Sequence, residues 1–96
     1  MNLRNAAKDQ PCLIRIPGYC NHDASTSCLC HSNLAGEGGM GMKANDIQAA
    51  IGCSGCHDVI DGRVQTHFTR DEIKAMFGDG VIRTLGVWVR AGILKW

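Results

Sequence analysis

The chain has 96 residues, with six cysteines and a net charge of +1 at pH 7. So short a chain buries little apolar surface, so we expect a single domain over residues 1–96 that needs a metal or disulfide constraint to be stable. The near-neutral charge argues against a strongly basic nucleic-acid-binding protein, so nucleic-acid binding would have to come from local clusters and a bound cation. No run approaches the roughly 18 apolar residues of a membrane span, so no membrane association is expected.

Residues 1–11 are polar and mildly basic, which predicts an arm or a short helix that ends at Pro11. The segment lacks the apolar core of a secretory signal, so we expect a cytoplasmic protein. Because the cytosol keeps thiols reduced, the cysteines are predicted to bind metal rather than to form disulfides.

Two strands are predicted in the first third of the chain. Residues 12–16 alternate in hydropathy, and Pro17 and Gly18 form a turn that leads back to Cys20. A second strand is predicted over residues 25–32. Alternation separates the side chains of that strand into two faces, with Ser27, Leu29 and His31 on one and Cys28, Cys30 and Ser32 on the other.

A glycine-rich loop is predicted over residues 33–45. Asp46 follows as the cap of a helical turn whose inward-facing residues are expected to be Ile47, Ala50 and Ile51. Beyond the next cysteines, a short helix is predicted from His57 to Asp61, stopped by Gly62. The i, i+4 spacing places His57 and Asp61 on the same face of this helix.

The last third of the chain predicts a long helix. Thr69 and Glu72 have the spacing of a capping box at its start, and the Gly-Asp-Gly segment at 78–80 is expected to break or kink it. An apolar stripe at helical spacing predicts the buried face, made of Ile73, Met76, Phe77, Val81, Leu85, Trp88 and Val89. Trp88 and Trp96 are expected in the core or at a dimer contact.

The cysteines include two pairs that lie far apart in the sequence. Cys12 and Cys20 flank a predicted turn, with seven residues between them, and Cys53 and Cys56 form a CxxC knuckle. Zinc prefers four tetrahedral ligands, so two pairs of thiolates can close a long chain segment around one structural Zn²⁺. The sequence therefore predicts Cys12, Cys20, Cys53 and Cys56 as metal ligands.

Alternatives to this ligand set remain open. Cys28 or Cys30 could replace a cysteine of the first pair, although a cysteine on the inner face of a strand is expected to pack as a small hydrophobe. His57 could also replace a cysteine as a zinc ligand. The CxxC followed by His57 matches the attachment pattern of c-type haem, but haem attachment implies export and leaves four further cysteines without a use, so no haem is expected.

The segment around the cysteine pairs resembles the HNH endonuclease family. In that family a strand carries a histidine, a loop follows, and a helix at or just after a CxxC knuckle supplies metal ligands. In this chain the corresponding segments are the strand residues 29–31, the glycine-rich loop 33–45 and the knuckle and helix 53–61. The resemblance implies that His31 is the general base, that His57 binds the catalytic cation and that Asp61 completes an H-x3-D pair where nuclease colicins have H-x3-H. It also implies an α+β fold, a small zinc-stapled ββα-metal domain with an added C-terminal helix.

One position departs from the family pattern. The family usually has Asp or His just before the base as a further metal ligand, and this chain has Cys30, which could coordinate a soft metal. A catalytic Mg²⁺ or other divalent cation would then be held by His57, Asp61, waters and substrate phosphate. Phosphodiester hydrolysis needs a base that activates water and a cation that neutralises the developing charge. His22 and His67 have no such pattern around them and are expected at the surface.

The whole chain is similar to the small prophage-encoded nucleases of the YbcO type, from residues 2–4 and 12–18 through 53–61 to the C-terminal helix. This resemblance implies an HNH-type nuclease that hydrolyses DNA phosphodiester bonds with His31, His57 and Asp61. The alternative is a non-catalytic zinc module that binds nucleic acid or a phage or host protein.

Overall fold

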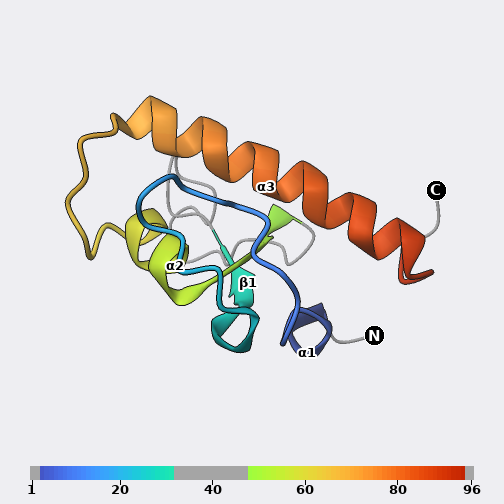
Figure 1. Cartoon of the computed structure of the whole chain (residues 1–96). Coiled ribbons are helices and arrows are strands. Elements are labelled where there is room, and N and C mark those ends of the chain that lie inside the picture. The colour runs from blue at the N-terminus through green and yellow to red at the C-terminus, as the bar shows by residue number, and fades with distance from the viewer. Residues whose placement is uncertain (1–2, 32–47, 95–96) are drawn as a thin grey trace, which may run out of the picture.

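The computed structural model describes residues 3–31 and 48–94 (Figure 1). Mixed helices and a small sheet confirm the predicted α+β class. None of the helices in these two ranges combines the length and the hydropathy that a membrane span requires. The elements in chain order are α1 (Leu3–Ala6), the 3₁₀ helix η1 (Ala24–Thr26), β1 (Cys28–Cys30), β2 (Ala50–Gly52), α2 (Ser54–Ile60) and α3 (Arg70–Arg90).

The sheet consists of β1 and β2, which pair antiparallel with Leu29 opposite Ile51 and Cys30 opposite Ala50. Alternation along the strands divides the core. Leu29 and Ile51 pack with Trp88 on one side, whereas Cys30 and Ala50 pack with the cysteines and Val59 of α2 on the other. Figure 1 shows α3 along one side of the molecule, with α1 and α2 at opposite sides of the sheet. The predicted separation of Leu29 from Cys28 and Cys30 is therefore confirmed.

The helix α3 begins at the predicted capping box. The Thr69 side chain accepts a hydrogen bond from the Glu72 amide at 3.1 Å, and the Thr69 amide donates to the Glu72 carboxylate at 2.8 Å. The predicted break at 78–80 is wrong, because the helix continues through these residues to Arg90. Thr84, which the apolar stripe omitted, joins α3 to β2, since its hydroxyl donates to the Gly80 carbonyl at 2.7 Å and accepts from the Ile51 amide at 3.0 Å.

Gly80 has a packing role that explains why a glycine is suitable in mid-helix. A Cβ at this position would lie 3.0 Å from a side-chain carbon of Ile14, 3.1 Å from the Ile14 Cα and 3.2 Å from the Leu13 carbonyl oxygen. The absence of a side chain therefore lets α3 approach the N-terminal segment closely. Gly78, two residues earlier, has nothing within 4 Å of the same point.

This pair of glycines gives a matched prediction. Gly80→Ala should lower the free energy of unfolding by ~1–3 kcal/mol, because the new methyl group meets backbone atoms that cannot move aside easily. Gly78→Ala should raise it by up to ~1 kcal/mol, because alanine favours the helix and meets open space. Urea denaturation followed by circular dichroism measures both. Equal effects of the two substitutions would contradict the close approach at Gly80.

Three predicted elements differ from the structure. Residues 12–16 do not form a strand, because Arg15 has a φ of 59°, in the left-handed region that an extended strand excludes. Residues 50–52 form β2 rather than part of a helical turn, since a run this short and wholly buried shows no helical or strand period. Of the strand predicted over 25–32, the described residues 25–31 form a strand only at Cys28–Cys30, after η1, and Ser32 lies outside the described residues. The predicted loop over 33–45, Asp46, Ile47 and Trp96 lie outside the described residues.

Candidate metal centre

Four thiols from two distant parts of the chain meet beside α2. Cys12 and Cys20 lie in the N-terminal segment, Cys53 is the N-cap of α2, and Cys56 lies in its first turn. Their Sγ atoms all lie within 4.8 Å of one another. Cys12 Sγ is 3.6 Å from Cys56 Sγ, and Cys53 Sγ is 3.8 Å from Cys20 Sγ. The structure thus brings together the four cysteines that the spacing singled out.

The separation of these sulfurs is suited to a tetrahedral metal ion. Zn–S bonds of about 2.3 Å at tetrahedral angles place two sulfur ligands about 3.8 Å apart, close to the observed separations. A disulfide would bring two sulfurs to about 2.05 Å, and all six cysteines are free thiols. The group could therefore hold a metal such as zinc.

Backbone amides surround these sulfurs as they would surround thiolates. Cys53 Sγ accepts from the amides of Asn21 and Cys56, both at 3.4 Å, and Cys56 Sγ accepts from the Ile16 amide at 3.4 Å. Hydrogen bonds to the charged form of an acid favour that form. The N-terminal segment thus supplies two of these three donors to the cysteines of α2, so hydrogen bonds join the two parts of the chain at this group.

Hydrogen bonding and burial move the pKa values of three of these thiols in different directions. The hydrogen bond between Cys12 and Cys56 lowers the pKa of Cys12 to about 4 and raises the pKa of Cys56. Burial raises the pKa of Cys20 to about 11. Closely spaced thiols cannot all ionise unless a cation balances their charge.

The helix α2 also positions the predicted His57 and Asp61 side chains. It begins at Ser54, three residues before the predicted start, and ends near Gly62, whose φ of 76° is the left-handed conformation typical of a helix end. As the i, i+4 spacing predicts, His57 Nε2 and Asp61 Oδ2 lie 3.1 Å apart. Arg63 Nη2 lies 3.3 Å from the same Asp61 oxygen. The His57 and Asp61 side chains are 30% and 16% exposed, so solvent reaches this pair.

The other nitrogen of His57 faces two cysteines of β1. Cys28 Sγ lies 3.5 Å from His57 Nδ1 and 3.9 Å from Cys30 Sγ, and the three ligand atoms all lie within 4.8 Å of one another. Cys30 packs in the core as predicted, but Cys28 is only half-buried. Strand alternation had placed both cysteines on one face, and Cys30 was a predicted candidate ligand for a soft metal, but the meeting of Cys28, Cys30 and His57 was not predicted.

The hydrogen bond between Cys28 and Cys30 lowers the pKa of Cys28 to about 6 and raises the pKa of Cys30. The two thiols of this group therefore differ, since the pKa of Cys28 is lowered whereas that of the buried Cys30 is raised.

His31 directly follows β1 and is half-buried. The two groups of ligand atoms found in the described part of the chain do not include it. Because β1 ends at Cys30, the alternation of the strand does not determine the direction of the next side chain. His22 and His67 are exposed, as predicted.

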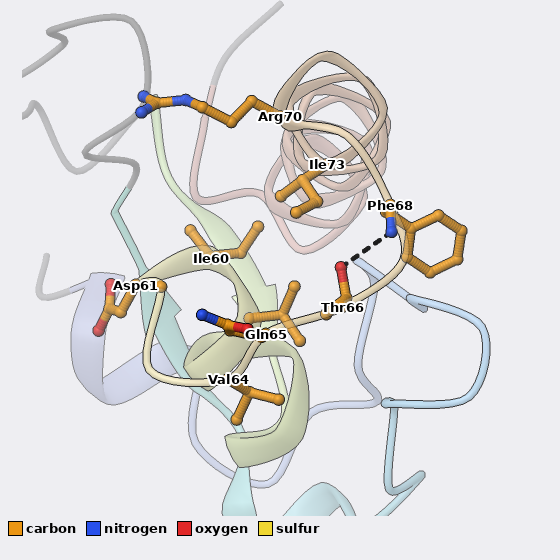
Figure 2. Close-up of a pocket in the computed structure, with 10 residues that line it drawn as sticks. Ile60, Asp61, Val64, Gln65, Thr66, Phe68, Arg70 and Ile73 are labelled. Atoms are coloured by element: carbon orange, nitrogen blue, oxygen red, sulfur yellow. Dashed lines mark hydrogen bonds between the residues drawn. The ribbon is translucent and has the colours of Figure 1, made fainter.

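A hollow of about 400 Å³ lies between the end of α2 and the start of α3, with Asp61 at its edge. In Figure 2 the Asp61 carboxylate and the extended Arg70 side chain lie on the same side of the hollow, and Phe68 lies on the opposite side. The hollow is otherwise lined by apolar residues and by the polar side chains of Gln65 and Thr66.

Comparison with known proteins gives a consistent result over nearly the whole chain. A family model described as "Putative nuclease YbcO" matches residues 1–93. The chain is 43% identical over 95 residues to "Putative nuclease YbcO" of Escherichia coli K12, covering 98% of this chain and 97% of that protein, and a protein of the same name in Enterobacteria phage 82 matches equally.

A solved structure titled as a putative bacteriophage protein from Escherichia coli K-12 has the same fold, with a TM-score of 0.77 and 38% identity over 95% of this chain and 100% of that one. The geometry of the cysteine groups is thus found on a scaffold shared with phage proteins. The chain therefore belongs to the YbcO family, whose model and matched members are described as "Putative nuclease".

Proposed function

We propose that this protein is a metal-dependent, HNH-type endonuclease that hydrolyses DNA phosphodiester bonds, with His31 as general base and a catalytic cation held by His57 and Asp61. The observation that carries the proposal is the pairing of His57 and Asp61 on one face of α2, with partly exposed side chains 3.1 Å apart. Membership of a family named for nuclease activity supports the reaction class.

The order of the elements supports the ββα-metal assignment. Two antiparallel strands are followed directly by α2, and the helix begins at the CxxC pair. In this arrangement the Cys12, Cys20, Cys53 and Cys56 group holds a structural Zn²⁺ that anchors the N-terminus of α2, while His57 lies in the same helix and Asp61 is its C-cap residue. A rigid element of this kind positions ligands more precisely than a loop does.

The separation of the two side chains suits a shared divalent cation. Ligand bonds of about 2.1 Å at right angles place two ligand atoms about 3.0 Å apart, close to the observed 3.1 Å. When bound, such a cation supplies charge for the phosphodiester oxygens. His57 and Asp61 hold it, and Arg63 restrains the Asp61 carboxylate. His31 takes the proton of the attacking water.

The substrate side of the proposed site is the hollow that borders Asp61. Arg70 lines it and extends on the Asp61 side, so its guanidinium can pair with a phosphate of the DNA backbone (Figure 2). The protein as a whole carries a net charge of only +1, so we expect DNA affinity to depend on the bound cation and on such local contacts.

Cleavage of supercoiled plasmid in the presence of Mg²⁺ or Mn²⁺ tests the proposal. Wild-type protein should nick or linearise the plasmid, and His31→Ala and His57→Ala should each lower the rate by at least about 100-fold, because each removes a group that moves the proton or holds the cation. His67→Ala is the matched control, since this exposed histidine packs on the Phe68 ring and belongs to neither group of metal-ligating side chains found in the described residues.

Two outcomes would contradict the proposal. In the first, His31→Ala cleaves as fast as the wild type, which would remove His31 as the base. In the second, folded wild-type protein cleaves no plasmid, single-stranded or branched DNA with any of several divalent cations. DNA binding without cleavage would then favour the non-catalytic zinc module.

A further inference from the structure

A second group of metal-ligating side chains lies beside β1, separate from the four-cysteine group. Cys28 and Cys30 present their sulfurs on one face of the strand, 3.9 Å apart, and His57 of α2 presents Nδ1 3.5 Å from Cys28 Sγ. All three atoms lie within 4.8 Å of one another. None of these residues belongs to the Cys12, Cys20, Cys53 and Cys56 set.

The spacing of the second group fits the same geometric test as the first. With a Zn–S bond of about 2.3 Å and a Zn–N bond of about 2.05 Å, tetrahedral angles place two sulfurs about 3.8 Å apart and a sulfur and a nitrogen about 3.6 Å apart. The observed 3.9 Å and 3.5 Å match both values. We propose that Cys28, Cys30 and His57 Nδ1 form a second metal site, which takes a thiophilic divalent cation such as Zn²⁺.

The chemistry of the ligands determines which cations this site prefers. Two thiolates and an imidazole favour Zn²⁺ and other soft or borderline ions, whereas Mg²⁺ prefers oxygen ligands. Three protein ligands leave a fourth tetrahedral position for water or another exchangeable ligand. Cys30 is fully buried and anchors the site in the core, whereas Cys28 is half-buried and the His57 side chain is 30% exposed, so a cation can enter from solvent.

Asp61 acts at this site as a positioning residue rather than as a ligand. A neutral imidazole that binds a cation through Nδ1 carries its proton on Nε2. In the structure Nε2 is 3.1 Å from Asp61 Oδ2, and Arg63 holds the same oxygen at 3.3 Å. A metal-bound histidine typically donates its other N–H to a carboxylate, which fixes the ring orientation. The thiolate site thus has its outer hydrogen bond in place.

The second site also bears on the proposed nuclease activity, and this consequence rests on that proposal. A neutral imidazole has a single lone pair, so His57 can bind a thiophilic cation through Nδ1 or a hard cation through Nε2 with Asp61, but not both. When Nδ1 binds the cation, Nε2 keeps Asp61 as its partner, and when Nε2 binds it, Nδ1 keeps Cys28. Zinc in the second site should therefore inhibit cleavage that depends on Mg²⁺.

Metal content tests the site without reference to activity. After purification with excess zinc and removal of loosely bound ions, mass spectrometry of the metal should find two zinc ions per wild-type chain. Cys28→Ser and His57→Asn should each retain one, and His67→Asn, the matched histidine control, should retain two. Circular dichroism should show that the variants remain folded, because the four-cysteine group is intact in all of them.

Cobalt provides a second readout of the ligands. Co²⁺ bound to the wild type should show more thiolate-to-metal charge-transfer absorbance per chain than Co²⁺ bound to Cys28→Ser, because the variant loses a sulfur ligand. A single zinc per folded wild-type chain, two zinc ions in folded Cys28→Ser, or a disulfide between Cys28 and Cys30 in the zinc-loaded protein would each overturn the second site.

The two proposals can be separated by adding zinc to the plasmid assay. In Mg²⁺, zinc should slow wild-type cleavage by at least about 10-fold, and the ratio of rates with and without zinc should approach one for Cys28→Ser. A wild type that binds two zinc ions but cleaves nothing with any cation would overturn the nuclease proposal and support the second site. A wild type that cleaves but binds one zinc would do the reverse.

Discussion

Cys56→Ser is expected to abolish metal binding by the four-cysteine group, which we propose holds a structural Zn²⁺, and to unfold the protein. Cys56 is fully buried, its sulfur lies 3.6 Å from Cys12 Sγ, and it accepts the Ile16 amide at 3.4 Å, so it joins α2 to the N-terminal segment in two ways. Structural zinc contributes on the order of 10–16 kcal/mol of binding free energy in small domains. That is comparable to the whole stability of a folded domain, about 5–15 kcal/mol.

Far-UV circular dichroism and metal content together measure this effect. Cys56→Ser should lose most of its helical signal and at least one zinc ion per chain, and a strong chelator should do the same to the wild type. Cys28→Ser is the matched control, since it also replaces a thiol near α2 but leaves the four-cysteine group complete. A metal-free Cys56→Ser that keeps wild-type helicity and melting temperature would show that the fold does not depend on this group.

Gly55→Ala should move the segment that carries Cys20 away from Cys53 and Cys56 of the same cysteine group. Gly55 lies between Cys53 and Cys56, and a Cβ at this position would fall on the carbonyl oxygen of Tyr19, with the Asn21 amide nitrogen 3.6 Å away. A methyl group must therefore push the backbone next to Cys20 away from α2. Overpacking of this kind costs ~1–3 kcal/mol or more, which exceeds the gain of up to ~1 kcal/mol in helix propensity.

The expected result is a fall of at least about 10-fold in zinc affinity, because each 1.4 kcal/mol corresponds to about a tenfold change in a binding constant. Competition with a chromophoric chelator measures the affinity, and thermal denaturation measures the stability. Gly78→Ala is the control, because it is also a helical glycine but meets open space. Unchanged zinc affinity in Gly55→Ala would contradict the close approach of Tyr19 to the knuckle.

The helices were the most predictable part of the fold. The capping box of Thr69 and Glu72, the stop at Gly62 and the pairing of His57 with Asp61 all depend on residues within four positions of each other. Trp88 was expected in the core and is 1% exposed. These features are local in the chain, so the sequence pattern was sufficient to predict them.

The strands were predicted less well, because their signals depend on distant partners. The alternating residues 12–16 contain Arg15 in the left-handed region, and Ala50–Gly52 form a strand through pairing with β1. Gly80, expected to interrupt α3, is instead the place where the helix meets Ile14. A glycine that weakens a helix and one that permits close packing look alike in a sequence, since only the neighbouring segment distinguishes them.

The residue types alone therefore determined that this small chain offers cysteines in metal-binding spacing and a histidine and carboxylate one helical turn apart. The spacing also predicted which four cysteines meet, but only the tertiary structure placed Cys28 and Cys30 together against His57. The physical reason is that hydrogen bonds within a helix act over four residues, whereas β1 and α2 are brought together by burial of a shared core across more than twenty residues of chain.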